Sequence, residues 1–120
     1  MIAVKDWDFI KKTHQLARKS GVLGQEAFAA ILVKNEKIVV QATDQFIAYG
    51  DPTAHAELVV ISEYCRKEQI ISLEGFTLFT STELCVMCSG AIHWAKISRV
   101  VFSVSQKGLQ SISGVRLKPS

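Results

Sequence analysis

Hydrophobic and polar positions first repeat with a helical period near the N-terminus, over residues 6–19. Apolar side chains recur there at the spacing of one helix face. The residues on or beside this face are Trp7, Phe9, Ile10, Thr13, His14, Leu16 and Ala17. The pair Ser20-Gly21 that follows is typical of a helix end, so the pattern predicts a first helix that stops there.

Two short runs rich in β-forming residues come next, at residues 27–33 and 38–42, with a polar turn between them. This arrangement predicts a β-hairpin. Residues 43–50 have the composition of a loop. Asp51 is a candidate N-cap and Pro52 suits the first position of a helix, so we expect a second helix from there to about Lys67.

The second half of the chain alternates strand and helix patterns. We expect a strand at residues 75–81, a third helix at 85–95 and a strand at 99–104, with only weak periodicity from Ser105 onward. This order of elements predicts an α/β domain. A helix joins the last two strands, so they should be parallel neighbours in the sheet.

The composition is that of one globular domain spanning residues 1–120, with 48% hydrophobic and 21% charged residues. The net charge of +3 permits nucleic-acid binding without arguing for it, because the basic residues are dispersed. No apolar stretch approaches the length of a membrane span, which takes about 20 residues. The N-terminus lacks an apolar secretory core, so we expect a cytoplasmic protein with no membrane contact.

The residues that carry chemistry gather in His55-Ala56-Glu57 and in Cys85-Val86-Met87-Cys88. One imidazole and two thiolates with an open fourth position are typical of a catalytic zinc site. A Glu two residues from the His is well placed to carry protons to and from a water molecule activated by the metal. The pattern H-x-E followed by C-x-x-C is the signature of zinc-dependent nucleobase deaminases. We therefore predict Zn²⁺ as cofactor, with His55, Cys85 and Cys88 as ligands and Glu57 as the catalytic proton carrier.

Both parts of this motif fall at the start of predicted helices, so two helix N-termini should converge on one point. Helix N-termini favour negative charge, which should help to hold the two cysteines as thiolates. Two alternatives remain open, a thioredoxin-type redox pair and a structural zinc site. A fourth ligand for the latter would have to come from His14, Cys65 or His93, none of which has ligand spacing. Cys65 is expected to be a buried free thiol.

The chain resembles the cytidine deaminase superfamily, and within it the branch of bacterial guanine deaminases, fungal-type cytosine deaminases and tRNA adenosine deaminases. The resemblance runs from about residue 7 to about residue 104 and is carried by Asp51-Pro52-Thr53-Ala54-His55-Ala56-Glu57, by residues 82–92 and by Arg99-Val100-Val101-Phe102. It implies a three-layer α/β/α sandwich around a mixed sheet of four to five strands, and a homodimer. It also implies hydrolytic deamination of a nucleobase or close heterocyclic analogue, guanine-like first, with release of ammonia.

The same resemblance implies four substrate-binding residues, Phe28, Asp44, Ala56 and Trp94. Phe28 occupies the aromatic position of a Pro-Phe-Gly-Ala stretch typical of base deaminases, which here is Ala27-Phe28-Ala29-Ala30. Trp94 lies in a segment, residues 92–96, that is similar to the third helix of guanine deaminases. Core packing is the alternative for both aromatic residues.

Three features depart from the family pattern. Asp44 stands eleven residues before His55, where many relatives carry an Asn whose amide contacts the base. A carboxylate only accepts hydrogen bonds, so we expect a substrate N–H toward Asp44, or a protonated Asp44; an Asx-turn is the alternative. Leu84 replaces the usual Pro and should leave zinc binding intact. The chain also stops earlier than many relatives, which leaves open how the pocket is closed.

Two other functions remain open. The first is tRNA adenosine-to-inosine deamination, but the basic C-terminal helix of those enzymes has only Lys107, Arg116 and Lys118 as counterparts here. The second is a catalytically altered deaminase-fold protein that binds a partner. The residues that keep this second option open are Ala27, Ala29, Asp44 and Leu84, together with the short tail.

Overall fold

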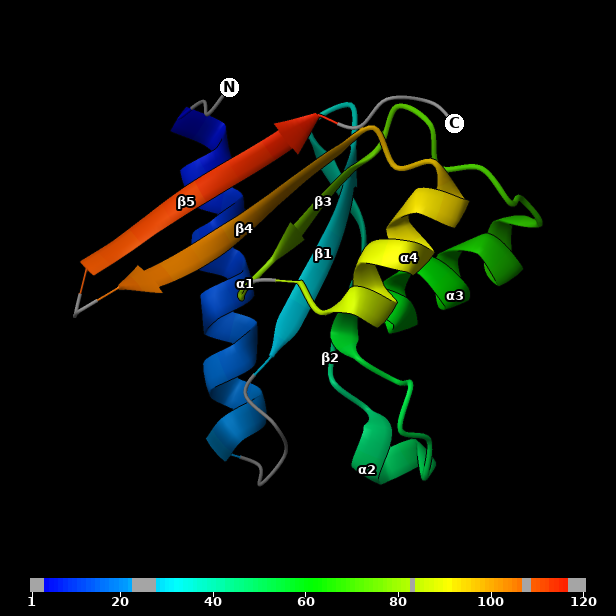
Figure 1. Ribbon diagram of the computed structural model, residues 1–120, viewed down its shortest axis with the longest axis horizontal. Helices are drawn as coiled ribbons and strands as arrows, with labels where there is room; N and C mark the ends of the chain where they lie inside the picture. The colour runs from blue at the N-terminus through cyan, green and yellow to red at the C-terminus, as the bar shows by residue number, and fades with distance from the viewer. Residues whose placement is uncertain (1–3, 23–27, 83, 107–108, 117–120) are drawn as a thin grey trace.

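The computed structural model describes residues 4–22, 28–82, 84–106 and 109–116, with side chains as far as residue 103 (Figure 1). In chain order the elements are α1 (Val4–Val22), β1 (Ala29–Lys34), β2 (Lys37–Thr43), α2 (Phe46–Tyr49), α3 (Ala56–Glu68), β3 (Thr77–Thr80), α4 (Val86–Ala95), β4 (Arg99–Gln106) and β5 (Leu109–Arg116). The α/β order expected from the sequence is confirmed. The short helix α2 and the strand β5 were not expected from the pattern.

The strands form one mixed sheet in the order β2-β1-β3-β4-β5. The predicted hairpin is confirmed: β1 and β2 are antiparallel, and Asn35 and Glu36 turn the chain with positive φ angles of 52° and 63°. Strands β3 and β4 pair in parallel across α4, also as predicted. Strand β5 pairs with β4 in antiparallel fashion and supplies the fifth strand that the family resemblance implied.

Helices cover both faces of the sheet, with α1 on one face and α3 and α4 on the other (Figure 1). Successive side chains of a strand point to opposite faces, so Ile31 and Val33 pack toward α1. Ala30 and Leu32 pack toward α3 and α4 in the larger cluster. Strand β1 is therefore buried on both faces, which is why its sequence is a continuous apolar run. The three-layer α/β/α sandwich is confirmed.

Two predicted helix boundaries are wrong. Helix α1 continues past Ser20, because this side chain is buried against the rest of the molecule and packing outweighs the local Ser-Gly signal. Helix α3 begins at Ala56 rather than at Pro52, because the Asp51 carboxylate accepts hydrogen bonds from the Thr53 N–H and hydroxyl and closes an Asx-turn instead. None of the helices in the described part of the chain has the length and apolar character needed to cross a bilayer.

A buried ion pair fastens α1 to β4. The Arg99 guanidinium donates to both carboxylate oxygens of Asp6, at 2.9 and 2.6 Å. We expect Arg99→Met to lower the free energy of unfolding by about 2–3 kcal/mol, because it leaves the Asp6 carboxylate buried without its charged partner. Lys5→Met is the control, since the Lys5–Glu36 pair is exposed to solvent. Urea unfolding of both variants measures the difference, and equal midpoints would contradict it.

Candidate metal centre and substrate cavity

Strand pairing brings three chain segments together at one end of the sheet. Ala29, at the start of β1, pairs with Thr43 at the end of β2, and Ala30 pairs with Thr80 at the end of β3. Ser81 extends this junction, since its N–H donates to the Ala29 carbonyl and its hydroxyl accepts from the Ala29 N–H, both at 3.0 Å. The chain leaves this end of the sheet toward α3 and toward α4. The N-termini of these two helices therefore meet, as the sequence predicted.

His55, Cys85 and Cys88 meet at this point. His55 Nδ1 lies 3.7 Å from each sulfur, and the two Sγ atoms are 3.3 Å apart. A tetrahedral zinc ion with bonds of about 2.0–2.3 Å holds its ligand atoms about 3.5–3.8 Å apart. The donor set fits zinc in its chemistry and in the two distances from His55, while the two sulfurs lie slightly closer together than zinc would hold them. The sulfurs are too far apart for a disulfide, and both cysteines are free. Among the described residues, these three form the one group of His, Cys, Asp and Glu side chains arranged to hold a metal.

The surroundings of Cys88 oppose its ionisation when no metal is bound. Burial raises the pKa of the Cys88 thiol well above its ordinary value, and the nearby Glu57 carboxylate adds to this effect. Desolvation and a neighbouring negative charge both favour the neutral thiol, and here they outweigh the helix N-terminus. The cation itself must therefore supply the field that keeps Cys88 ionised.

Metal binding should consequently release a proton from Cys88. Because the raised pKa keeps this thiol neutral at pH 7, the apparent affinity for zinc should increase with pH, by about tenfold per pH unit for each proton released. Calorimetric titration in buffers with different ionisation enthalpies counts the released protons. The titrations are run between about pH 6.5 and about pH 8, below the ordinary pKa of a cysteine thiol. A zinc affinity independent of pH over this interval would contradict the prediction.

Glu57 is the second residue of α3 and is buried, with 5% of its surface exposed. Burial raises the pKa of its carboxyl group, and the charge of Asp44 contributes in the same direction. Its carboxyl group lies beside Cys88. A carboxyl group with a raised pKa next to a metal centre binds a proton more readily than an ordinary glutamate and is suited to accept and return protons there.

A cavity of about 300 Å³ opens over the metal-binding residues and is lined by Phe28, Asp44, Phe46, His55, Glu57, Thr82 and Cys85. Phe46 carried no signal in the sequence, and Thr82 belonged to a segment that carries the family resemblance but was not expected to be a site residue. Phe46 belongs to α2, inside the segment expected to be loop, and its ring lies 6.3 Å from that of His55. Aromatic rings beside a metal centre can hold a flat heterocycle by stacking.

Only two of the four residues expected to contact substrate line the cavity. Phe28 and Asp44 line the cavity. Trp94 lies on the outer surface of α4, 83% exposed, and is not part of the cavity wall. Ala56 is buried, and its N–H donates to Asp44 Oδ1 at 2.6 Å. This bond joins Asp44 to α3.

Several other residues that the sequence analysis singled out lie outside the cavity wall or outside the described ranges. Leu84, in the position of the usual Pro, packs against the larger core cluster. Cys65 is free but only half-buried, so the expectation of a fully buried thiol is wrong. Ala27, Lys107 and Lys118 lie outside the described residues.

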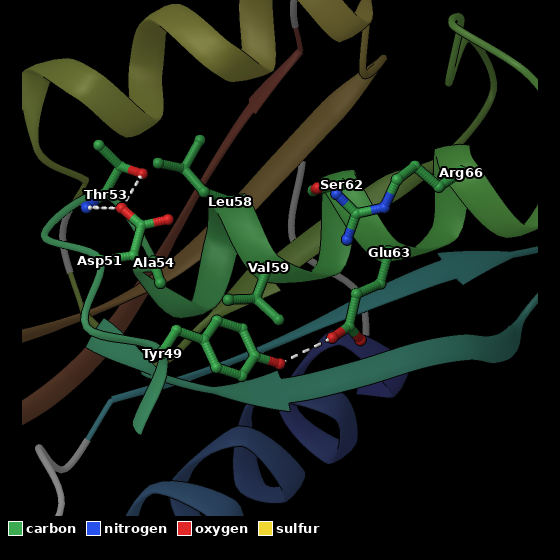
Figure 2. A pocket seen from close by; sticks show the side chains of 9 residues that line it. All are labelled: Tyr49, Asp51, Thr53, Ala54, Leu58, Val59, Ser62, Glu63 and Arg66. Atoms are coloured by element: carbon green, nitrogen blue, oxygen red, sulfur yellow. Dashed lines mark hydrogen bonds between the residues drawn. The ribbon is translucent and has the colours of Figure 1, made fainter. Parts of the chain in front are cut away.

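A second, smaller cavity of about 160 Å³ lies beside α3, away from the metal-binding residues (Figure 2). The hydrogen bonds drawn in Figure 2 run from the Tyr49 hydroxyl to Glu63, and from both the N–H and the hydroxyl of Thr53 to Asp51. Both carboxylates are thus engaged by neighbouring side chains. Glu63, which lies on α3 outside the metal centre, gives a control position for the carboxylates of the main cavity.

A His-Cys-Cys centre with a buried carboxyl group beside it, at the start of two helices of an α/β/α sandwich, defines a zinc hydrolase centre of the deaminase type. The sequence model of the family described as the cytidine and deoxycytidylate deaminase zinc-binding region matches residues 4–104. The chain belongs to this family. The three residues arranged to hold a metal, His55, Cys85 and Cys88, lie within the matched region.

Individual relatives differ in substrate. The chain is 34% identical to a tRNA-specific adenosine deaminase of Aquifex aeolicus, over 93% of this chain and 76% of that one. It is 35% identical to the guanine deaminase of Bacillus subtilis, over 79% of this chain and 62% of that one. A probable cytosine deaminase of Schizosaccharomyces pombe is 32% identical over 90% of this chain, which spans 65% of the yeast protein.

Solved structures give the same division. A structure from studies of A-to-I editing by tRNA deaminases superposes with a TM-score of 0.74 at 30% identity, covering 78% of this chain and 72% of that one. The Bacillus subtilis guanine deaminase also superposes with a TM-score of 0.74, at 35% identity, covering 79% of this chain and 60% of that one. The family and fold are thus fixed, while the substrate is not.

Proposed function

We propose that this chain is a zinc-dependent aminohydrolase of a nucleobase or close heterocyclic analogue, with a guanine-like ring as the first candidate. The observation that carries the proposal is the meeting of His55, Cys85 and Cys88 beside Glu57 at one cavity. Zinc, when bound, supplies Lewis-acid activation of a water molecule at neutral pH. The volume of the cavity is at the lower end of the range for small-molecule sites, which favours a ligand of the size of one nucleobase.

The protein's own residues support each remaining step. Glu57 accepts a proton from water as the oxygen adds to the amino-bearing ring carbon. It then returns protons to a ring nitrogen and to the departing amine. The carbon–nitrogen bond breaks, ammonia leaves and a carbonyl group remains on the ring. Phe28 and Phe46 wall the cavity and would hold the ring and exclude bulk water.

Ammonia release tests this function directly. The panel consists of guanine, cytosine, adenine, their nucleosides, aminotriazines and pterins, assayed with zinc-loaded protein. We expect turnover of at least one amino-substituted ring, guanine or a close analogue first. Zinc-loaded protein that releases ammonia from none of them would refute the proposal and favour the binding-protein alternative.

Adenosine deamination in tRNA is the second candidate. It is supported by the Aquifex aeolicus relative, whose similarity extends over 93% of this chain. Inosine formation in a transcribed tRNA distinguishes it from the small-molecule reaction. Inosine without ammonia release from any free base would replace the first candidate with the second.

A homodimer and a cytoplasmic location complete the proposal. The outer surface of α4 exposes Val86, Met87 and Trp94, an uncharged apolar face that would be covered by the same face of a second copy. Sedimentation should then give twice the chain mass, and Trp94→Glu should give the monomer. The reduced state of Cys85 and Cys88, which zinc binding requires, is favoured in the cytoplasm.

A further inference from the structure

Helix α3 begins without a cap from its own N-cap residue. That residue is His55, whose side chain makes no capping hydrogen bond because its ring faces the sulfurs of Cys85 and Cys88. The first N–H groups of a helix have no partner within the helix and need an acceptor from elsewhere. Recruiting His55 to the metal centre therefore leaves the start of α3 dependent on another residue.

Asp44 supplies this acceptor. Its Oδ1 accepts the N–H of Ala56, the first residue of α3, at 2.6 Å. The carboxylate is 4% exposed, so this bond is shielded from water. A bond from an N–H to a buried carboxylate is among the stronger hydrogen bonds of proteins. An ordinary N-cap lies next to its helix, whereas this one acts from the end of β2.

The backbone around Asp44 is itself held from two sides. The Asp44 N–H donates to the Phe28 carbonyl at 3.2 Å, and the Gln45 N–H donates to the Ala54 carbonyl at 2.9 Å. The first bond ties Asp44 to the residue before β1, and the second ties its neighbour to the residue before His55. The position of the carboxylate is thus set by the sheet and transmitted to α3.

We propose that the main role of Asp44 is to position the first turn of α3, which carries His55 and Glu57. Contact with the substrate is then a secondary role. Ala56 stands between the ligand His55 and the proton carrier Glu57, and it is fully buried. Holding the Ala56 N–H fixes the rotation of the first turn of α3, and with it the directions of both side chains. The inference deepens the proposed function, because it concerns the same metal centre.

Cobalt(II) binding tests this role without any substrate, because thiolate-bound cobalt has visible absorption bands that report ligand geometry. Asp44→Ala should weaken cobalt binding by about tenfold or more, the usual effect of losing a group that orients a ligand, and should shift the bands. Asp44→Asn should stay within about threefold of wild type with unchanged bands, because an amide oxygen caps a helix nearly as well. Glu63→Ala is the control, since it removes a carboxylate of α3 that accepts a hydrogen bond from Tyr49 and lies about two turns away from the start of this helix.

Wild-type affinity and bands in Asp44→Ala, with only KM or substrate preference changed, would overturn the proposal in favour of a substrate contact. Hydrogen exchange on the wild-type protein tests it even if that variant does not fold. The Ala56 amide should exchange about 100-fold more slowly than an unstructured amide, and exchange at the unstructured rate would also overturn it. The ammonia panel reports on the proposed function separately, so a silent panel with the expected cobalt result refutes only that function.

Discussion

The Glu57→Gln variant should bind zinc as tightly as the wild-type protein and release ammonia about 10²–10⁴-fold more slowly. The amide keeps the size of the carboxyl group but cannot accept a proton from water. His55, Cys85 and Cys88, which would hold the metal, are unchanged. Metal content and kcat on the best substrate of the panel measure the two halves of the prediction.

A stability measurement separates this effect from damage to the fold. Burial raises the pKa of Glu57, so the folded protein binds its proton more tightly than the unfolded chain does. Folding is therefore favoured at low pH, and part of that stability is lost as the pH rises through the raised pKa. Glutamine is neutral at every pH, so the metal-free variant should melt at or above the wild-type temperature at pH 7.

Glu63→Gln is the matched control for this experiment. It removes a second carboxylate of α3, one that accepts a hydrogen bond from Tyr49 in the smaller cavity. Its turnover should equal that of the wild-type protein. Near-normal turnover in Glu57→Gln, or an equal loss in Glu63→Gln, would remove Glu57 from the proposed reaction.

The metal centre could be predicted from sequence because its residues sit next to features with strong local signals. His55 and Glu57 flank the start of a helix, and Cys85 and Cys88 are one helical turn apart at the start of another. The strands on either side of α4 have clear strand patterns and are joined by a helix, so the parallel pairing of β3 with β4 could also be predicted. Strand β1 pairs in antiparallel fashion with both β2 and β3, so the ends of β2 and β3, from which the chain runs to the two helix starts, lie at one end of the sheet.

The cavity wall and the start of α3 could not be predicted in the same way. The Asx-turn at Asp51 and the cap from Asp44 both use acidic residues before a helix, and local sequence alone does not say which carboxylate reaches the first helical N–H. Phe46 lies in a short helix with no periodic pattern. Strand β5 is rich in Ser, Gln and Gly and gains its place only by pairing along β4. The cap from Asp44 and the place of β5 both depend on pairing with another segment of the chain.

Substrate choice therefore rests on the part of the site that sequence defines least. The cavity is bounded by Phe28 at the start of β1 and by Phe46 in α2. Because Asp44 accepts a hydrogen bond from the first N–H of α3, other residues of the cavity wall must contribute to recognition of the edges of the substrate ring. Relatives that share the metal centre can then differ in substrate, as the guanine and tRNA adenosine deaminases do.

The second large effect should come from Cys88→Ser. A serine hydroxyl stays protonated at neutral pH and does not replace a thiolate as a zinc ligand. Loss of a direct ligand should exceed the cost of losing an orienting group, so zinc affinity should fall by more than about 10²-fold and turnover should disappear. Added zinc should raise the melting temperature of the wild-type protein but not that of the variant, because a ligand stabilises only a fold that binds it.

Cys65→Ser gives the matched control, because this thiol is free, half-buried and located on α3 outside the metal centre. The control should keep both zinc binding and the zinc-dependent rise in melting temperature. The metal-free Cys88→Ser protein should still fold, since the polar substitution replaces a neutral buried thiol that packs beside Glu57. A zinc-dependent rise of wild-type size in Cys88→Ser would show that the ion is held elsewhere, and would remove the metal centre on which the proposed hydrolysis depends.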